Sequence, residues 1–202
     1  GSQAMPTNKF SFFLLLIFIF SSMDTRQYIY ISTLGILEIK TEDTALAELR
    51  ITNRSADNET FSANKPCINS PQTQENNLPQ HIRLIKAWLD EYFSGKEPDV
   101  PLELTPHGTE FQLRVWESLC EIPYGTTVTY GDIAERLNLQ CPTRRTSSRA
   151  VGQAVGRNPI GIIIPCHRVI GAGNKLTGFN AGIDAKISLL NIENIDTAKL
   201  KR

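Results

Sequence analysis

Short stretches of alternating apolar and polar positions fill the first part of the chain and are typical of β-strands. Gln27 to Ser32 and Gly35 to Lys40 predict two strands joined by a tight turn, and Ala45 to Ile51 predicts a third that pairs with them. Residues 53–77 are rich in Asn, Ser, Gln and Pro, so they predict a loop. Pro79 to Phe93 then predicts an amphipathic helix, because its apolar residues recur at helical spacing.

Residues 96–106 contain three prolines and predict a linker to a second, mostly helical part. The pattern Thr109-x-x-Gln112 is a capping box, which predicts a helix reaching about Cys120. Tyr130 to Leu139 predicts another helix.

Arg149 to Arg157 predicts the next helix, capped by Ser147 or Ser148. Two helices joined by a turn, the second of them basic, favour a helix-turn-helix, although the turn over 141–146 is longer than usual for that motif. The expected fold class is α/β of the α+β kind. A small amino-terminal antiparallel sheet with a helix precedes a mostly helical carboxy-terminal domain.

The helix over 149–157 is rich in small residues, which let another surface come close. That surface is either another helix or a nucleic-acid backbone, and the arginines at both ends make us favour nucleic acid. The small residues are Ala150, Gly152, Ala154 and Gly156.

An apolar run, Ile162 to Ile164, ends at Pro165 and is followed by Cys166 and His167. The β-branched run predicts a buried strand that stops at the proline, with Cys166 at its end. Cys166 is either a small buried hydrophobic residue or a nucleophile activated by its neighbour, since the thiolate is the reactive form.

The net charge is zero, but it is unevenly distributed. Residues 1–105 hold 9 Lys/Arg and 13 Asp/Glu, whereas residues 106–202 hold 12 and 8. From Arg136 to Ile183 there are six arginines and one lysine but no acidic residue. This local excess favours contact with phosphates.

Four scattered cysteines, Cys67, Cys120, Cys141 and Cys166, form no C-x-x-C pair and no Cys/His cluster with metal spacing. They argue against a disulfide framework and a structural zinc site, and favour a reducing compartment. Cys120 is expected in the core.

The amino terminus is unusual. Gly1 to Ala4 resembles the remnant of an expression tag, and residues 10–20 form an apolar run with the length of a signal-peptide core. We favour Met23 as the natural start over a genuine signal or anchor. The expected organisation is an extension over 1–22, an amino-terminal domain over 23–105 and a carboxy-terminal domain over 106–202.

The segment SSRAVGQAVGRNPIGIIIPCHRVIG, followed by KLTGFNAG, resembles the alkylguanine-DNA alkyltransferases, also called methylated-DNA–protein-cysteine methyltransferases. The earlier segments GTEFQLRVW and IPYGTTVTYGDIA match as well. The resemblance is strong from Gly108 to Glu193 and looser from Tyr28 to Pro106.

The resemblance implies a one-way transfer of an alkyl group from the exocyclic oxygen of guanine to Cys166. His167 would draw off the thiol proton through a water, and Glu193 would orient the imidazole. Asn158 would bridge the turns of the site by hydrogen bonds, and Tyr130 would stabilise the departing guanine. No cofactor and no metal are implied.

It further implies a flipped base and a helix set into the minor groove of double-stranded DNA that carries alkylated guanine. Arg149 would fill the vacated stack. The DNA-binding residues would be Arg149, Ala150, Gly152, Ala154, Gly156, Arg157 and Arg168, and the substrate pocket would hold Phe179, Asn180, Ala181 and Lys186.

Three features depart from the family pattern: Phe179 replaces a usual tyrosine, Asn180 and Ala181 replace smaller residues, and the segment before Arg149 is longer. They bear on which alkyl groups fit. We expect a cytoplasmic monomer with no membrane contact. The alternatives are a DNA-lesion binder without transfer, a Cys-His hydrolase, and a transcription factor that uses the helix-turn-helix alone.

Overall fold

A computed structural model describes residues 24–52 and 65–201. Three antiparallel strands, β1 (Thr25–Ser32), β2 (Gly35–Glu42) and β3 (Ala45–Thr52), form one sheet in that order. The predicted strands are confirmed. β2 continues two residues beyond the expected end, because Thr41 and Glu42 still pair with β3 across a register shift.

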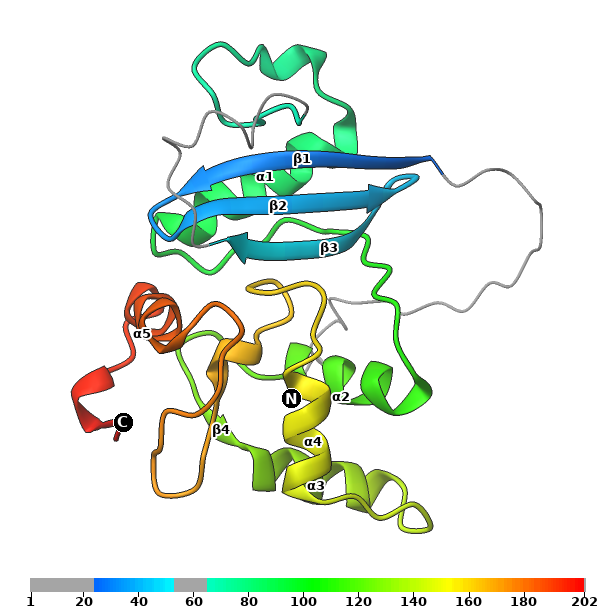
Figure 1. Cartoon of the computed structure of the whole chain (residues 1–202), viewed down its shortest axis with the longest axis vertical. Coiled ribbons are helices and arrows are strands. Elements are labelled where there is room, and N and C mark those ends of the chain that lie inside the picture. The colour runs from blue at the N-terminus through cyan, green and yellow to red at the C-terminus, as the bar shows by residue number, and fades with distance from the viewer. Residues whose placement is uncertain (1–23, 53–64, 202) are drawn as a thin grey trace, which may run out of the picture.

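Helix α1 (Gln80–Phe93) lies behind this sheet, as Figure 1 shows. Its apolar stripe is buried, and Gly95, with a positive φ of 80°, ends it. Between the sheet and α1 there is a short 3₁₀ turn, Glu75–Asn77, in the region expected to be a loop. The prediction for residues 53–64 lies outside the described residues.

The carboxy-terminal half holds the helices α2 (Glu110–Cys120), α3 (Tyr130–Gln140), α4 (Ser148–Val155) and α5 (Ile183–Ile192). It also holds the short parallel strands β4 (Val128–Thr129) and β5 (Val169–Ile170) and the 3₁₀ turns Cys166–Arg168 and Thr197–Lys199. The predicted capping box of Thr109 and Gln112 is present, and Ser147 caps α4. The residues 156 and 157, expected in α4, form a turn after it.

Ile162 to Ile164 do not form the strand that we predicted. They lie in a tight turn, in which Ile163 N donates to Gly161 O at 2.8 Å and Ile164 N donates to Ile160 O at 3.0 Å. Ile162 has a φ of 69°, an uncommon conformation for a β-branched residue. The run is apolar because all three side chains are buried in the core. A buried turn and a buried strand give the same apolar pattern, so the pattern alone cannot distinguish them.

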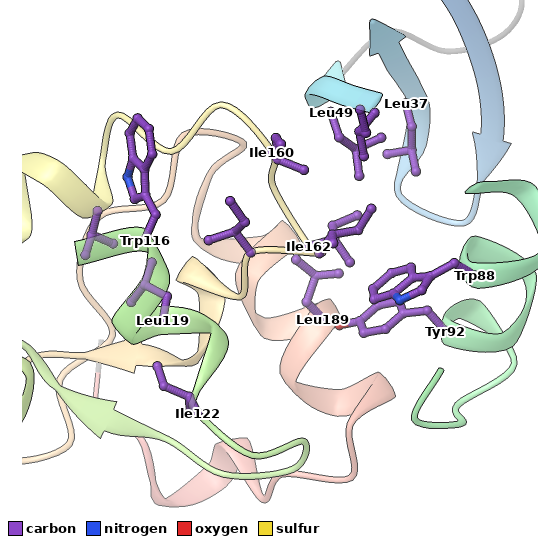
Figure 2. Packing of buried hydrophobic residues seen from close by; sticks show 14 of the residues in the cluster. Leu37, Leu49, Trp88, Tyr92, Trp116, Leu119, Ile122, Ile160, Ile162 and Leu189 are labelled. Atoms are coloured by element: carbon purple, nitrogen blue, oxygen red, sulfur yellow. The ribbon is translucent and has the colours of Figure 1, made fainter. Parts of the chain in front are cut away.

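Both halves share one hydrophobic core. Figure 2 shows Ile160 and Ile162 of this turn in one cluster with Leu37 and Leu49 of the sheet and with Tyr92 of α1. The turn is also bonded to the free edge of β3, because Leu49 N donates to Pro159 O and Gly161 N to Leu49 O, both at 2.9 Å. The sheet therefore fixes the segment that leads to Cys166.

Cys120 packs against the core as predicted, and burial raises the pKa of its thiol to about 12. Within residues 24–52 and 65–201 no group of His, Cys, Asp and Glu could hold a metal ion. No helix in this described part is long and apolar enough to cross a membrane.

Candidate active site and DNA-binding face

Cys166 begins the 3₁₀ turn Cys166–Arg168 directly after Pro165 and is partly exposed. It lies in the wall of a cavity of about 380 Å³. The strand β3, the turn after α4 and the loop before α5 form the other walls. The lining residues are Leu49, Arg50, Ile51, Val155, Gly156, Arg157, Asn158, Pro159, Gly161, Cys166, Gly178, Phe179, Asn180 and Ala181.

Asn158 holds the turn in front of the cysteine. Its Nδ2 donates to Ile164 O at 2.8 Å, and its Oδ1 accepts from Ile160 N at 3.0 Å. The side chain thus bridges the two ends of the turn. This placement is the one that the resemblance implied for Asn158.

His167 is fully buried beside Cys166. Its Nε2 lies 2.6 Å from Glu193 Oε1, whereas its Nδ1 is buried and has no hydrogen-bond partner among the described residues. Because a carboxylate accepts, the proton of a neutral imidazole belongs on Nε2. Nδ1 is then left as a free acceptor, which a base for the thiol requires.

Glu193 accepts five hydrogen bonds although it is almost completely buried. Arg168 donates through Nε to Oε2 at 2.8 Å and through Nη2 to Oε1 at 3.1 Å, and Gly125 N donates to Oε2 at 3.1 Å. Burial alone would raise the pKa of Glu193, but His167 and Arg168 outweigh it and lower that pKa to about 2. The carboxylate therefore stays ionised and fixes the imidazole.

Arg168 does not lie on the surface predicted to bind DNA. Besides its two bonds to Glu193, it donates through Nη1 to Ile122 O at 2.6 Å, and its side chain is only 12% exposed. The resemblance had implied that it binds DNA together with Arg149 and Arg157. The buried carboxylate of Glu193 instead requires the charge of Arg168 as a partner.

Cys166 and His167 form a neutral pair at rest. Burial raises the pKa of the Cys166 thiol, while the hydrogen bond from Asn158 and the charge of Lys186 act in the opposite direction. Burial likewise lowers the pKa of His167, against the pull of Glu193. A thiol beside an unprotonated imidazole is therefore the starting state, and the imidazole can take the proton.

Lys186 was predicted to lie in the substrate pocket, but it does not line the cavity. It is fully buried behind the loop that forms one cavity wall, and its Nζ donates to Val169 O at 2.5 Å and to Thr177 O at 2.9 Å. Burial lowers its pKa to about 8. Phe179, Asn180 and Ala181 do line the cavity, as expected for a substrate pocket.

Tyr130 begins α3 and is not among the residues that line this cavity. Its hydroxyl lies 3.5 Å from Thr177 Oγ1, and its ring lies beside Gly152 of α4. The hydroxyl oxygen accepts from Thr177, so its own proton is free for another partner.

The small residues of α4 point in several directions. Ala154 is buried, with its carbonyl accepting from Trp116 Nε1 at 2.9 Å, and Gly152 faces the Tyr130 ring. The alternative of packing against another helix therefore holds for Ala154, which lies against α2, whereas Gly152 is partly exposed beside the Tyr130 ring. The outer face of α4 carries Arg149, Gln153, Gly156 and Arg157, all exposed, with Ala150 partly exposed beside them.

Gln153 and Tyr92 are two residues of the site that were not predicted. Gln153 shares the exposed face because it lies four residues from both Arg149 and Arg157, a spacing visible in the sequence. Tyr92 of α1 donates to Glu193 Oε1 at 2.9 Å, and its hydroxyl lies 3.2 Å from His167 Nε2. No sequence signal distinguishes Tyr92 from the other buried residues of its helix.

The fold places a partly exposed cysteine, with a buried histidine–glutamate pair beside it, close to two helices joined by a turn, α3 and α4. Residues 110–195 match the family model described as 6-O-methylguanine DNA methyltransferase, DNA binding domain. A methylated-DNA–protein-cysteine methyltransferase of Methanosarcina mazei is 54% identical over 112 residues, which cover 55% of this chain and 68% of that protein. The methylated-DNA–protein-cysteine methyltransferase of Methanosarcina acetivorans is 46% identical over a stretch that covers 66% of this chain and 81% of that protein.

The crystal structure of the Mycobacterium tuberculosis O6-methylguanine methyltransferase is similar with a TM-score of 0.65 and 36% identity, over 84% of this chain and 92% of that one. A structure of the M. tuberculosis protein OGT in complex with DNA gives a TM-score of 0.64 at 33% identity, over 87% of this chain and 94% of that chain. The chain belongs to the methylated-DNA–protein-cysteine methyltransferase family, whose members are DNA-repair methyltransferases.

Proposed function

We propose that this protein repairs duplex DNA by transferring an alkyl group, typically methyl, from the exocyclic oxygen of guanine, and of thymine, to its own Cys166. The observation that carries the proposal is the position of Cys166. It lies in a cavity wall, with the Nδ1 of His167 free and the Nε2 held by Glu193. The similarity to an M. tuberculosis O6-methylguanine methyltransferase supports the same chemistry.

In the proposed reaction, His167 Nδ1 takes the proton of the Cys166 thiol, through one water. The sulfur then attacks the alkyl carbon, so that a carbon–sulfur bond forms while the carbon–oxygen bond breaks. The electron pair of the broken bond stays on the guanine. Once the base occupies the cavity and the loop that carries Thr177 lies against it, Tyr130 stabilises this negative charge by donating a hydrogen bond from its hydroxyl to a ring nitrogen.

The product is a thioether, which has no proton left to lose and no leaving group for water to displace. Each molecule therefore reacts once and is consumed. Turnover would require a separate step that removes the alkyl group from sulfur, and none of the groups around Cys166 supplies one. We accordingly infer a stoichiometric reaction.

The cavity requires the target base to leave the duplex, because the cysteine lies within a cavity wall and cannot reach the edge of a base that is still held in the stack. Arg149 is exposed at the start of α4 and would fill the vacated space. Phe179 would contact the flipped base, while Asn180, which donates to Gly156 O at 2.8 Å, ties the pocket loop to the end of α4.

The outer face of α4 would lie in the minor groove. Ala150 and Gly156 allow close approach to the backbone, while Arg149 and Arg157 supply charge at the two ends. Gln153 adds a polar side chain between them. Contacts of this kind are largely independent of sequence, which suits a protein that searches all DNA for damage. We further propose that it acts as a monomer in the cytoplasm.

The test is incubation with duplex DNA containing O6-methylguanine, followed by mass spectrometry of the intact and digested protein. We expect a mass increase of one CH₂ group per molecule, on Cys166. Cys166→Ala should abolish transfer and keep lesion binding, whereas the matched variant Cys141→Ala should react normally. Lesion binding without any adduct would instead indicate a non-reactive lesion binder, and repeated hydrolysis of esters or peptides would indicate a hydrolase.

A second variant tests base flipping. Arg149→Ala should slow transfer from duplex DNA but leave transfer from a free benzylated guanine base unchanged, since the free base need not be flipped. Equal rates from duplex DNA for the variant and the wild type would refute the role of Arg149.

A further inference from the structure

We propose that the loop over residues 141–146, which joins α3 to α4, is a second DNA contact that holds a backbone phosphate beside the start of α4. The proposal rests on the proposed function, because it needs α4 to lie on the duplex. In Figure 1 this yellow-green loop projects beyond the first turn of α4. It is also the segment that is longer than usual for a helix-turn-helix.

The loop is fixed in place by Asn138, near the end of α3. Asn138 Nδ2 donates to Thr146 O at 3.0 Å, and Thr146 N donates to Asn138 Oδ1 at 2.6 Å. Within the loop, Arg144 N donates to Cys141 O at 3.1 Å. These bonds reduce the entropy that the loop would otherwise lose on binding.

Three arginines surround a hollow of about 320 Å³ at the base of the loop. Arg114 comes from α2, while Arg144 and Arg145 come from the loop itself. Ala150 of α4 also lines the hollow, so this surface is continuous with the face proposed to enter the minor groove. The remaining lining residues are Glu110, Phe111 and Thr146.

The charges at the hollow favour an anion. In the described part of the chain, Arg114 and Arg145 form no ion pair with an acid, and no acidic residue lies between Arg136 and Ile183. Arg144 pairs with Glu110 at 2.9 Å, but both side chains are mostly exposed, at 68% and 73%. Such an exposed pair contributes little, so Arg144 can exchange Glu110 for a phosphate.

DNA is the partner that these features fit. Guanidinium groups bind phosphate through several parallel hydrogen bonds, and a DNA strand lying along α4 brings phosphates past its first turn. The hollow has one large apolar side chain, Phe111, and three arginines, so it offers little to an apolar peptide. We therefore infer a phosphate contact that extends the footprint of the helix-turn-helix.

The experiment measures binding of an undamaged duplex by fluorescence anisotropy across a series of salt concentrations. For Arg144→Ala/Arg145→Ala, each lost phosphate contact should reduce the slope of log K against log salt by about 0.9 and weaken binding by about eightfold at 0.1 M salt. Glu110→Gln should strengthen binding by about two- to fivefold, because it frees Arg144. Arg83→Ala, on the exposed side of α1, is the matched control and should change neither quantity.

Transfer from a free benzylated guanine base separates this proposal from the proposed function. All of these variants should react with the free base at the wild-type rate. An unchanged salt slope in the double variant, with a reduced slope in Arg149→Ala, would overturn the loop contact and leave the repair function standing. Failure of the wild-type protein to acquire an alkyl group on Cys166 would overturn the proposed function instead.

Discussion

Replacing Tyr92 by phenylalanine tests whether the amino-terminal half contributes to the chemistry of the site. The substitution removes one hydroxyl that donates to Glu193 Oε1 at 2.9 Å and leaves the aromatic ring in place. A hydrogen bond to a charged group contributes about 1.5–3 kcal/mol. Since four other donors still hold Glu193, we expect a loss of stability at the lower end, about 1.5–2 kcal/mol.

The same change should alter the reaction in a distinctive way. Glu193 Oε1 accepts from three donors, Tyr92, His167 and Arg168, so losing one leaves more of its negative charge for the other two. We take one third of the free energy of the lost hydrogen bond to strengthen the bond between Glu193 and the protonated imidazole of His167. The protonated form is then stabilised by about 0.5 kcal/mol. More of the base is then protonated at acidic pH, and transfer there should slow by about a further twofold relative to the plateau.

Single-turnover transfer rates from pH 5 to pH 9, with thermal unfolding of the same samples, would measure both effects. Tyr30→Phe is the matched control, because Tyr30 is also a buried tyrosine of the same half and donates to Asp90 Oδ1 at 2.7 Å, away from the site. It should lose stability without any change in the pH dependence. A wild-type pH–rate profile for Tyr92→Phe, with only a lower Tm, would refute the positioning role and leave Tyr92 a structural residue.

Three further outcomes follow from the geometry. Asn158→Ala leaves two backbone groups of the cysteine turn without partners, so it should lower the free energy of unfolding in urea by about 2–3 kcal/mol and slow transfer at least about tenfold. The control Asn138→Ala should leave the rate of the reaction with a free base unchanged. The pKa of Glu193 in the folded state, about 2, lies below its ordinary value of 4.5, so its contribution is complete above pH 4.5 and is lost as the pH falls towards 2. Unfolding measured between pH 6 and pH 2 should show about 3 kcal/mol of this loss in the wild type and not in Glu193→Gln, and equal slopes for the two would contradict the assignment. Gly125→Ala should destabilise the protein by about 1–2 kcal/mol, because φ is 72° there and a Cβ would lie 3.2 Å from Glu193 O; thermal unfolding equal to wild type would contradict it.

The local elements could be predicted from the sequence because each carries its own signal. The capping box at Thr109 and the spacing of the strands were sufficient to place most helices and strands within a few residues. The apolar run at Ile162 was not sufficient, because burial on all sides gives the same pattern in a turn as in a strand. The direction of the α4 residues was predicted only in part: Arg149 and Arg157 are exposed, but Ala154, expected to bind DNA, shares the buried face of Val151 and Val155.

The chemistry of the site depended more on long-range contacts, which a single sequence does not reveal. Arg168 was expected to bind DNA, and only the fold shows that a buried carboxylate 25 residues later is its partner. The resemblance placed Lys186 in the substrate pocket, yet it holds the substrate loop from behind. In both cases a cation satisfies buried acceptors, a demand that arises only after folding.

The amino-terminal sheet is itself part of the proposed site, and this could not be inferred from any motif. Residues 49–51 of β3 form one wall of the cavity, and Leu49 is bonded through both its N–H and its C=O to the turn that precedes Cys166. Tyr92, from the helix behind that sheet, reaches the carboxylate that orients His167. The two halves therefore cannot move apart without disturbing both the cavity and the imidazole. For this reason, we expect that a carboxy-terminal fragment keeping the helix-turn-helix would still bind DNA but would transfer the alkyl group slowly.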